Sequence, residues 1–131
     1  MLKVRCLSMT KNQSPVGWYV GSYLVRFVEL DDEDNYDPES RFLSWENTVI
    51  VKAIDKSEAY DKVEKLGHEH CEPYKGGEQG IDVSWLYVGI TQLVAVYDEL
   101  EDGSEIMWAE NNKKKLKTLE TFVYSKEEFF E

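Results

Sequence analysis

The sequence is poor in cysteine, and this scarcity argues against a disulfide-rich secreted scaffold. Its 131 residues include two cysteines, Cys6 and Cys71, which lie far apart and form no CxxC pair. Two unrelated thiols in a chain of this size indicate a reduced, cytoplasmic protein, although a disulfide between them stays open.

Basic residues are also scarce. The chain has 15 Lys and Arg against 26 Asp and Glu, which gives a formal net charge of −11. A chain with this negative charge is repelled by the phosphates of nucleic acid, so we expect no binding to duplex nucleic acid. The same charge attracts basic proteins over long distances, and many nucleases are basic. The composition therefore favours a basic protein partner.

Long hydrophobic runs and catalytic motifs are absent from the sequence. No apolar stretch approaches the length of a membrane-spanning helix, and Met1–Arg5 is followed by a polar stretch, not by the apolar core of a signal peptide. We expect a cytoplasmic protein without membrane contact. No phosphate-binding glycine loop or nucleophile elbow occurs, so we predict a protein that is not an enzyme and has no cofactor.

The residues that are present suit a single folded domain spanning residues 1–131. Hydrophobic residues make up 42% of the chain and aromatic residues 13%, which is enough for a core. β-prone segments occur at 2–8, 18–28, 42–54, 81–97, 106–109 and 118–124. We predict an α+β fold, with a curved and mainly antiparallel sheet of five to six strands and one main amphipathic helix in the order ββαβββ.

The helix is expected to follow the second of these strands. Asp55 and Glu58 have the spacing of an N-cap and capping box. The helix ends at Gly67 or continues to His70. Two glycines mark irregular places in the strands: Gly21 predicts a bulge or a close backbone approach, and Gly89 predicts a bend or bulge.

The most distinctive segment is an acidic loop at residues 29–40. Seven acids and no Lys or Arg occur between Glu29 and Glu39. Like charges at this density repel, so the segment is predicted to be a solvated loop. Its spacing does not match an EF-hand. If the loop binds a basic partner, the contact residues are Asp31, Asp32, Glu33, Asp34, Tyr36 and Asp37. The alternative is a solvated insertion without function.

One further cluster carries side chains that could bind zinc. His68, His70 and Cys71 are chemically suited to this metal. On a helix, however, His68 and His70 diverge, and no fourth ligand is evident. We therefore predict no metal site and keep these three residues only as weak candidates. Cys71 with either histidine is also the one candidate pair for nucleophilic catalysis.

Five short motifs together resemble a known family. In order, they are Trp18–Ser22, Trp45–Val49, Lys65–Gly67, Trp85–Gly89 and Leu100–Glu105. Over residues 18–109 the chain resembles the bacterial domain-of-unknown-function family DUF4288. The resemblance implies a small bacterial α+β domain and carries no catalytic residue to this chain. The acidic loop and a C-terminal extension at 111–131 do not match the motifs.

These observations favour a protein that works by binding. The most concrete hypothesis is an acidic inhibitor or immunity-type protein that neutralises a basic toxin or nuclease. The alternative is a homo-oligomeric module that binds a small ligand between the sheet and the helix. One helix covers only one face of the sheet. The chain ends or a second copy could cover the other, which leaves a homodimer open.

Overall fold

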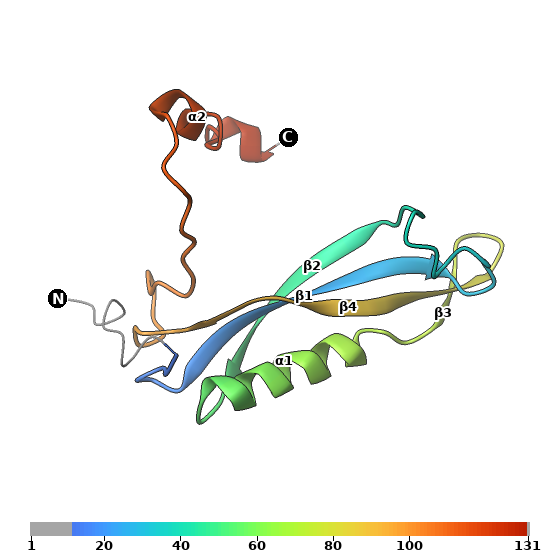
Figure 1. Cartoon of the computed structure of the whole chain (residues 1–131), viewed down its shortest axis with the longest axis horizontal. Coiled ribbons are helices and arrows are strands. Elements are labelled where there is room, and N and C mark those ends of the chain that lie inside the picture. Colours follow the sequence, from blue (N-terminus) through green and yellow to red (C-terminus); the bar gives the residue numbers. More distant parts are fainter. Residues whose placement is uncertain (1–11, 131) are drawn as a thin grey trace.

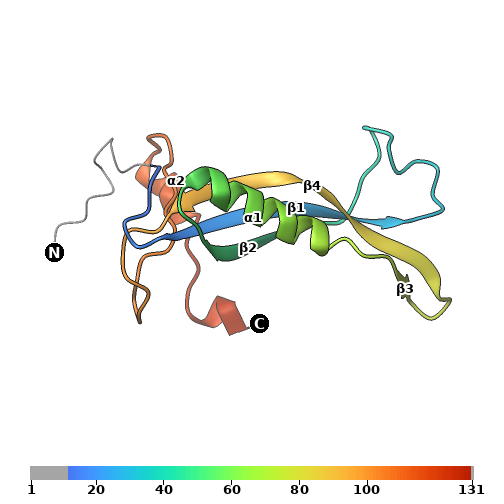
Figure 2. The same cartoon turned by 90° about the horizontal axis from the view of Figure 1, so that it is seen from below.

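The computed structural model describes residues 12–130 and shows an α+β fold built on one curved sheet (Figure 1). Its elements in chain order are β1 (Trp18–Glu29), β2 (Ser44–Lys52), α1 (Lys56–Glu69), β3 (Tyr74–Gly76), β4 (Ile81–Ala95), α2 (Leu116–Glu120) and the 3₁₀ helix η2 (Glu127–Phe130). The strands form an antiparallel sheet in the order β2-β1-β4-β3. Figure 2 shows α1 lying across one face of this sheet.

The predicted α+β class, antiparallel sheet and single main helix are confirmed, but the predicted number of strands is wrong for the described part of the chain. Residues 106–109 form no strand, and residues 118–124 begin inside helix α2. A strand needs a hydrogen-bonding neighbour, and the 118–124 segment lies away from every sheet edge (Figure 1). Conversely, Tyr74–Gly76, which lies outside the β-prone segments of the sequence, forms strand β3. The strand expected at 2–8 lies outside the described residues.

Strand β1 is central because both of its faces are apolar. It pairs with β2 on one side and with β4 on the other. Tyr19 and Val25 are fully buried beneath the helix, and Val20 on the opposite face is only 1% exposed. Burial on both faces is what the continuous apolar run of this strand predicts.

Strand β4 is irregular, and the irregularity curves the sheet. Its pairing with β1 shifts twice, so that Val88 and Thr91 have no partner in the register. The shift at Val88 adjoins Gly89, where the sequence predicted a bend or bulge. Strict alternation would place Tyr87 and Ile90, which are three positions apart, on opposite faces. Because the extra residue Val88 shifts the alternation by one position, both pack against the core.

The helix packs unusually close to the sheet at two glycines. A Cβ atom built on Gly21 of β1 would lie 2.6 Å from Cγ2 of Val63, and one built on Gly67 of α1 would lie 2.6 Å from the Tyr87 ring. The close approach predicted at Gly21 is therefore confirmed. The buried core around these contacts consists of Tyr19, Tyr23, Val25, Val51, Ala53, Ala59, Val63, Trp85 and Ala95.

Helix α1 begins as the sequence predicts. The backbone N–H of Glu58 donates to Oδ1 of Asp55 at 2.8 Å, so Asp55 is the N-cap. The Glu58 carboxylate in turn accepts from the N–H of Ile54 at 3.3 Å. The helix does not stop at Gly67 but continues to Glu69, with His70 as C-cap.

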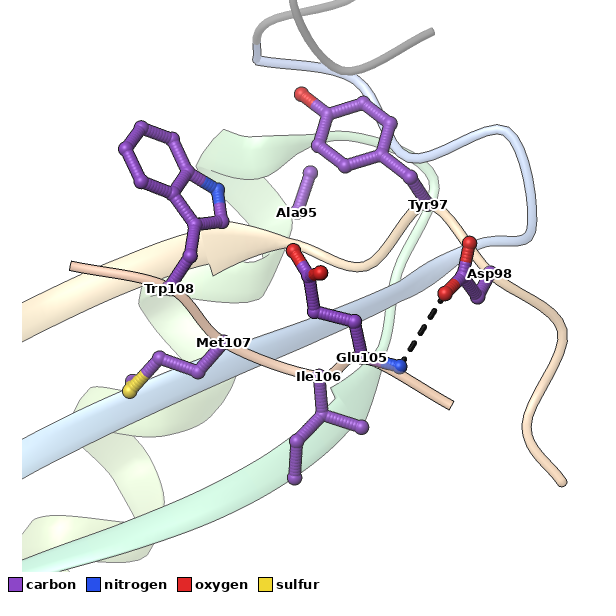
Figure 3. Close-up of a pocket in the computed structure, with 7 residues that line it drawn as sticks. All are labelled: Ala95, Tyr97, Asp98, Glu105, Ile106, Met107 and Trp108. Atoms are coloured by element: carbon purple, nitrogen blue, oxygen red, sulfur yellow. Dashed lines mark hydrogen bonds between the residues drawn. The ribbon is translucent and has the colours of Figure 1, made fainter. Parts of the chain in front are cut away.

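The opposite face of the sheet is covered differently along its length. Figure 3 shows the segment Glu105 to Trp108 crossing the sheet on the side away from α1. Beyond it, the chain rises on that same side and carries α2 and η2 away from the sheet (Figure 1). Among residues 12–130, no helix combines the length and apolar character needed to span a membrane.

Candidate functional site

The acidic loop between β1 and β2 is folded into a series of tight turns. Four backbone hydrogen bonds of 3.0 to 3.4 Å, each between residues three apart, run along it from Glu29 to Ser40. Two aspartates add side-chain bonds: Oδ1 of Asp32 accepts from the N–H of Asp34, and Oδ1 of Asp37 accepts from the N–H of Glu39, both at 2.9 Å. Asp32 and Asp37 therefore shape the loop as well as charging it.

Asn35 fastens the middle of this loop to β1. It is only 6% exposed, in contrast to the acids on either side of it. Its side-chain amide donates to the carbonyl oxygen of Glu29 at 2.7 Å. Its own carbonyl oxygen accepts from Nη1 of Arg26 at 2.6 Å. These two bonds tie the loop to the last part of the central strand.

Arg26 also holds the two aromatic residues of the loop. Its guanidinium carbon lies 4.5 Å from the centre of the Phe42 ring and 5.3 Å from that of Tyr36. Such cation–π contacts are worth about 0.5–2 kcal/mol each, depending on desolvation. One side chain on β1 thus contacts the middle and the end of the loop, and we call Arg26 with Asn35, Tyr36 and Phe42 the Arg26 clamp.

The acids predicted as contact residues all lie on this clamped loop, and none of them has an ion-pair partner among the described residues. Asp31, Asp32, Glu33, Asp34 and Asp37 are exposed, and within residues 12–130 none of them forms an ion pair. Arg26 forms no ion pair with them; its guanidinium contacts a carbonyl oxygen and two rings. Tyr36 is 81% exposed beside them. Negative charge and an aromatic ring are therefore presented together.

A shallow hollow lies within the clamp. It has a volume of about 270 Å³ and opens widely to solvent. Its lining residues are Arg26, Asn35, Tyr36, Asp37, Pro38, Ser40 and Phe42. An open hollow with an aromatic rim and a carboxylate suits a protruding side chain of a partner protein better than an enclosed small molecule.

The sequence did not identify Arg26, Asn35 and Phe42 as members of this site. The available signal was a single basic residue, Arg26, three positions before an acidic run that contains no base. That signal could not show which atoms Arg26 contacts, because the contacts depend on how the loop folds back toward its strand.

The three weak zinc candidates do not converge. The His68 ring stacks on Tyr87, with ring centres 4.1 Å apart, whereas His70 packs edge-on to Tyr23 and Trp85. Nδ1 of His70 lies 3.3 Å from the Tyr23 hydroxyl, and the Cys71 thiol donates to the carbonyl oxygen of Gly67. In the described part of the chain, no three His, Cys, Asp or Glu side chains gather closely enough to hold a metal ion.

The environment of Cys71 also disfavours nucleophilic attack. Burial raises the pKa of its thiol above the ordinary value, and this outweighs the opposing effect of a hydrogen bond from the Tyr87 backbone. Because the thiolate is the nucleophile, a raised pKa leaves the sulfur less reactive at neutral pH.

Comparison with known families decides the identity of the domain. DUF4288, described as a domain of unknown function, matches residues 18–108. The chain belongs to the DUF4288 family. No curated protein and no solved structure matches it. The family predicted from five motifs is therefore confirmed.

The DUF4288 region contains β1, β2, α1, β3, β4 and the acidic loop, and it ends where Trp108 crosses the sheet. One cavity of this region is small. The cavity in Figure 3, bordered by Tyr97 and Trp108, measures about 10 Å³, which is room for about one water molecule. At Gly21 the helix also leaves no space above the sheet. Helices α2 and η2 lie outside the matched region.

Proposed function

We propose that this DUF4288 protein is a non-enzymatic binding domain that neutralises a basic protein, in the manner of an acidic inhibitor or immunity protein. The partner would be a basic toxin or nuclease, bound in the bacterial cytoplasm. The observation that carries the proposal is the acidic loop, whose carboxylates have no ion-pair partner among the described residues while the Arg26 clamp holds their backbone in place.

The clamp matters because binding costs conformational entropy. A flexible acidic loop would have to be ordered by its partner, which subtracts from affinity. Here the turns, the buried Asn35 and the Arg26 contacts order the loop before a partner arrives. A loop that is already ordered loses less conformational entropy on binding, so a larger part of its interaction energy contributes to affinity.

Charge and aromatic exposure would make separate contributions. The cluster of unpaired carboxylates accelerates the encounter with a basic surface, an effect that weakens as salt screens it. Tyr36, which is 81% exposed and rests against Arg26, offers the kind of rigid aromatic anchor that carries binding energy at protein interfaces. Charge is thus expected to control the association rate, and Tyr36 the dissociation rate.

The test uses a loop variant that removes charge without removing the turns. Asp31, Asp32, Asp34 and Asp37 are replaced together by Asn, whose Oδ1 still accepts the hydrogen bonds made at Asp32 and Asp37. The parent chain is immobilised and the basic protein that it retains from cell extract is isolated. Binding of that protein is then measured for each variant over a range of salt concentrations.

The matched control removes four negative charges elsewhere: Asp61→Asn, Glu69→Gln, Glu72→Gln and Glu78→Gln, all at exposed positions. The loop variant is expected to associate at least about tenfold more slowly at low salt and to lose most of the salt dependence. The control should stay close to the parent. Equal rates for the two variants would refute the role of the loop.

A further inference from the structure

The C-terminal segment 111–130 carries an apolar surface that its own domain does not cover. We call this segment the C-terminal arm. No residue of α2 or η2 is buried. Six large apolar side chains of the arm are each more than half exposed: Leu116, Phe122, Val123, Tyr124, Phe129 and Phe130. An exposed apolar surface this dense on a short segment is typical of an interaction site.

The sheet has a matching apolar area on the face turned away from α1. Strand alternation places Leu24 of β1, Ile50 of β2 and Leu86 of β4 on this face, beside the bulged Val88. Ile50 is 43% exposed and Val88 is 53% exposed. The arm rises on this side of the sheet but stands off from it (Figure 1). We call these four residues the open face.

The arm and the domain that carries it are also opposite in net charge. Residues 111–130 contain five lysines and three glutamates, four of the lysines falling within Lys113–Lys117. Residues 12–110 contain 22 acids and seven basic residues. The arm is therefore a basic segment attached to a strongly acidic domain, so its approach to such a domain is electrostatically favoured.

We propose that the arm of one copy docks on the open face of a second copy, so that two chains exchange arms. Each chain supplies one arm and one open face, which makes the contact reciprocal and closes it at two copies. This proposal rests on the arm and the sheet alone and is independent of the acidic loop's proposed function.

A second copy fits better than the same chain. The chain between Trp108 and Leu116 leads the arm away from its own sheet, so docking on itself would require that link to reverse. The six arm side chains together expose roughly 700 Å² of apolar surface. Two reciprocal arms would bury at most about 1,400 Å² of their own surface, which is the value for complete coverage and lies within the range of stable protein interfaces.

The experiment compares two variants with one control in the full chain. The arm variant is Phe122→Glu with Val123→Glu, and the face variant is Ile50→Glu with Val88→Glu. The control, Ile54→Glu with Tyr60→Glu, places the same charges at exposed apolar positions outside both surfaces. Sedimentation equilibrium measures the mass of each over a wide range of concentration, and circular dichroism checks that each is folded. If the double face variant unfolds, Val88→Glu alone replaces it.

The parent and the control are expected to be dimers, and the arm and face variants to be monomers. Mixing the two variants supplies the decisive result. The arm variant has an intact face and the face variant has an intact arm, so one of the two contacts can form and the mixture should recover heterodimers. A monomeric parent would overturn the proposal, as would folded variants that remain dimeric or fail to associate when mixed.

Discussion

Arg26 donates a hydrogen bond of 2.6 Å to the carbonyl oxygen of Asn35, and this bond joins the central strand to the middle of the acidic loop. The same guanidinium lies over Phe42, close to where the loop enters β2. A loop with seven acids would otherwise be driven open by its own charge. Arg26 therefore contributes to the order of the most acidic segment, together with the turns of the loop and the buried Asn35.

Replacing Arg26 by Met should release the loop, because Met preserves length but neither donates hydrogen bonds nor carries charge. A hydrogen bond from a charged group is worth about 1.5–3 kcal/mol, so we expect a loss of that order in the free energy of unfolding. Amide hydrogen exchange should rise at residues 30–42 while α1 stays protected. Arg41→Met, at an exposed position, is the control. Equal amide exchange in the two variants would show that the loop stays ordered without Arg26.

Gly21 should tolerate no side chain, because Cγ2 of Val63 would lie 2.6 Å from a Cβ at that position. We expect Gly21→Ala to lower the free energy of unfolding by about 1–3 kcal/mol, the usual cost of overpacking a core. Gly89→Ala is the matched control, since a Cβ there meets no atom within 4 Å. Denaturant unfolding measures both. If shortening Val63 to Ala does not reduce the cost of Gly21→Ala, the clash with Val63 is not its cause.

Local signals allowed the sequence to predict much of this fold. The apolar run of β1, the spacing of Asp55 and Glu58, and Gly21 each report a constraint that nearby residues impose. The 118–124 segment was mispredicted because its β-prone residues find no sheet edge, and the chain there forms α2 instead. For the site, the acids were visible in the sequence, but the Arg26 clamp was not, since it depends on the path by which residues 35–42 return to β1.

The Tyr87 hydroxyl should be dispensable for stability. Among the described residues it is buried without a hydrogen-bond partner. Burying an unsatisfied hydroxyl costs free energy, so Tyr87→Phe should leave stability unchanged or raise it by up to about 1–2 kcal/mol. Tyr19→Phe makes the same chemical change where the hydroxyl accepts from the N–H of Ser14 at 3.0 Å, and it should destabilise the fold. In thermal unfolding, Tyr19→Phe should lower the midpoint and Tyr87→Phe should not. Equal destabilisation by the two changes would show that the Tyr87 hydroxyl has a stabilising partner.

Alkaline pH should weaken the fold partly through Cys71. Burial raises the pKa of its thiol above the ordinary value of 9.0, so the folded chain holds this proton more tightly than the unfolded chain does. The contribution to stability is thus complete below the ordinary pKa and declines as pH rises through the raised one. Burial raises the pKa of the Tyr87 and Tyr97 hydroxyls as well, and these act in the same direction from higher pH.

Denaturant unfolding from about pH 8 to about pH 10 isolates the part played by Cys71, because this interval brackets the ordinary pKa of a thiol. Cys71→Ala should lose less stability over this interval than the parent, with Cys6 replaced by Ser in both chains so that one thiol alone titrates. The tyrosines are common to both chains. The pKa of Tyr87, which burial and, to a smaller extent, the Cys71 thiolate raise, lies above this interval. Alkylation should also show the thiol reacting more slowly in the folded chain than in the unfolded one. Parallel pH profiles for parent and variant would mean that the thiol titrates alike in both states.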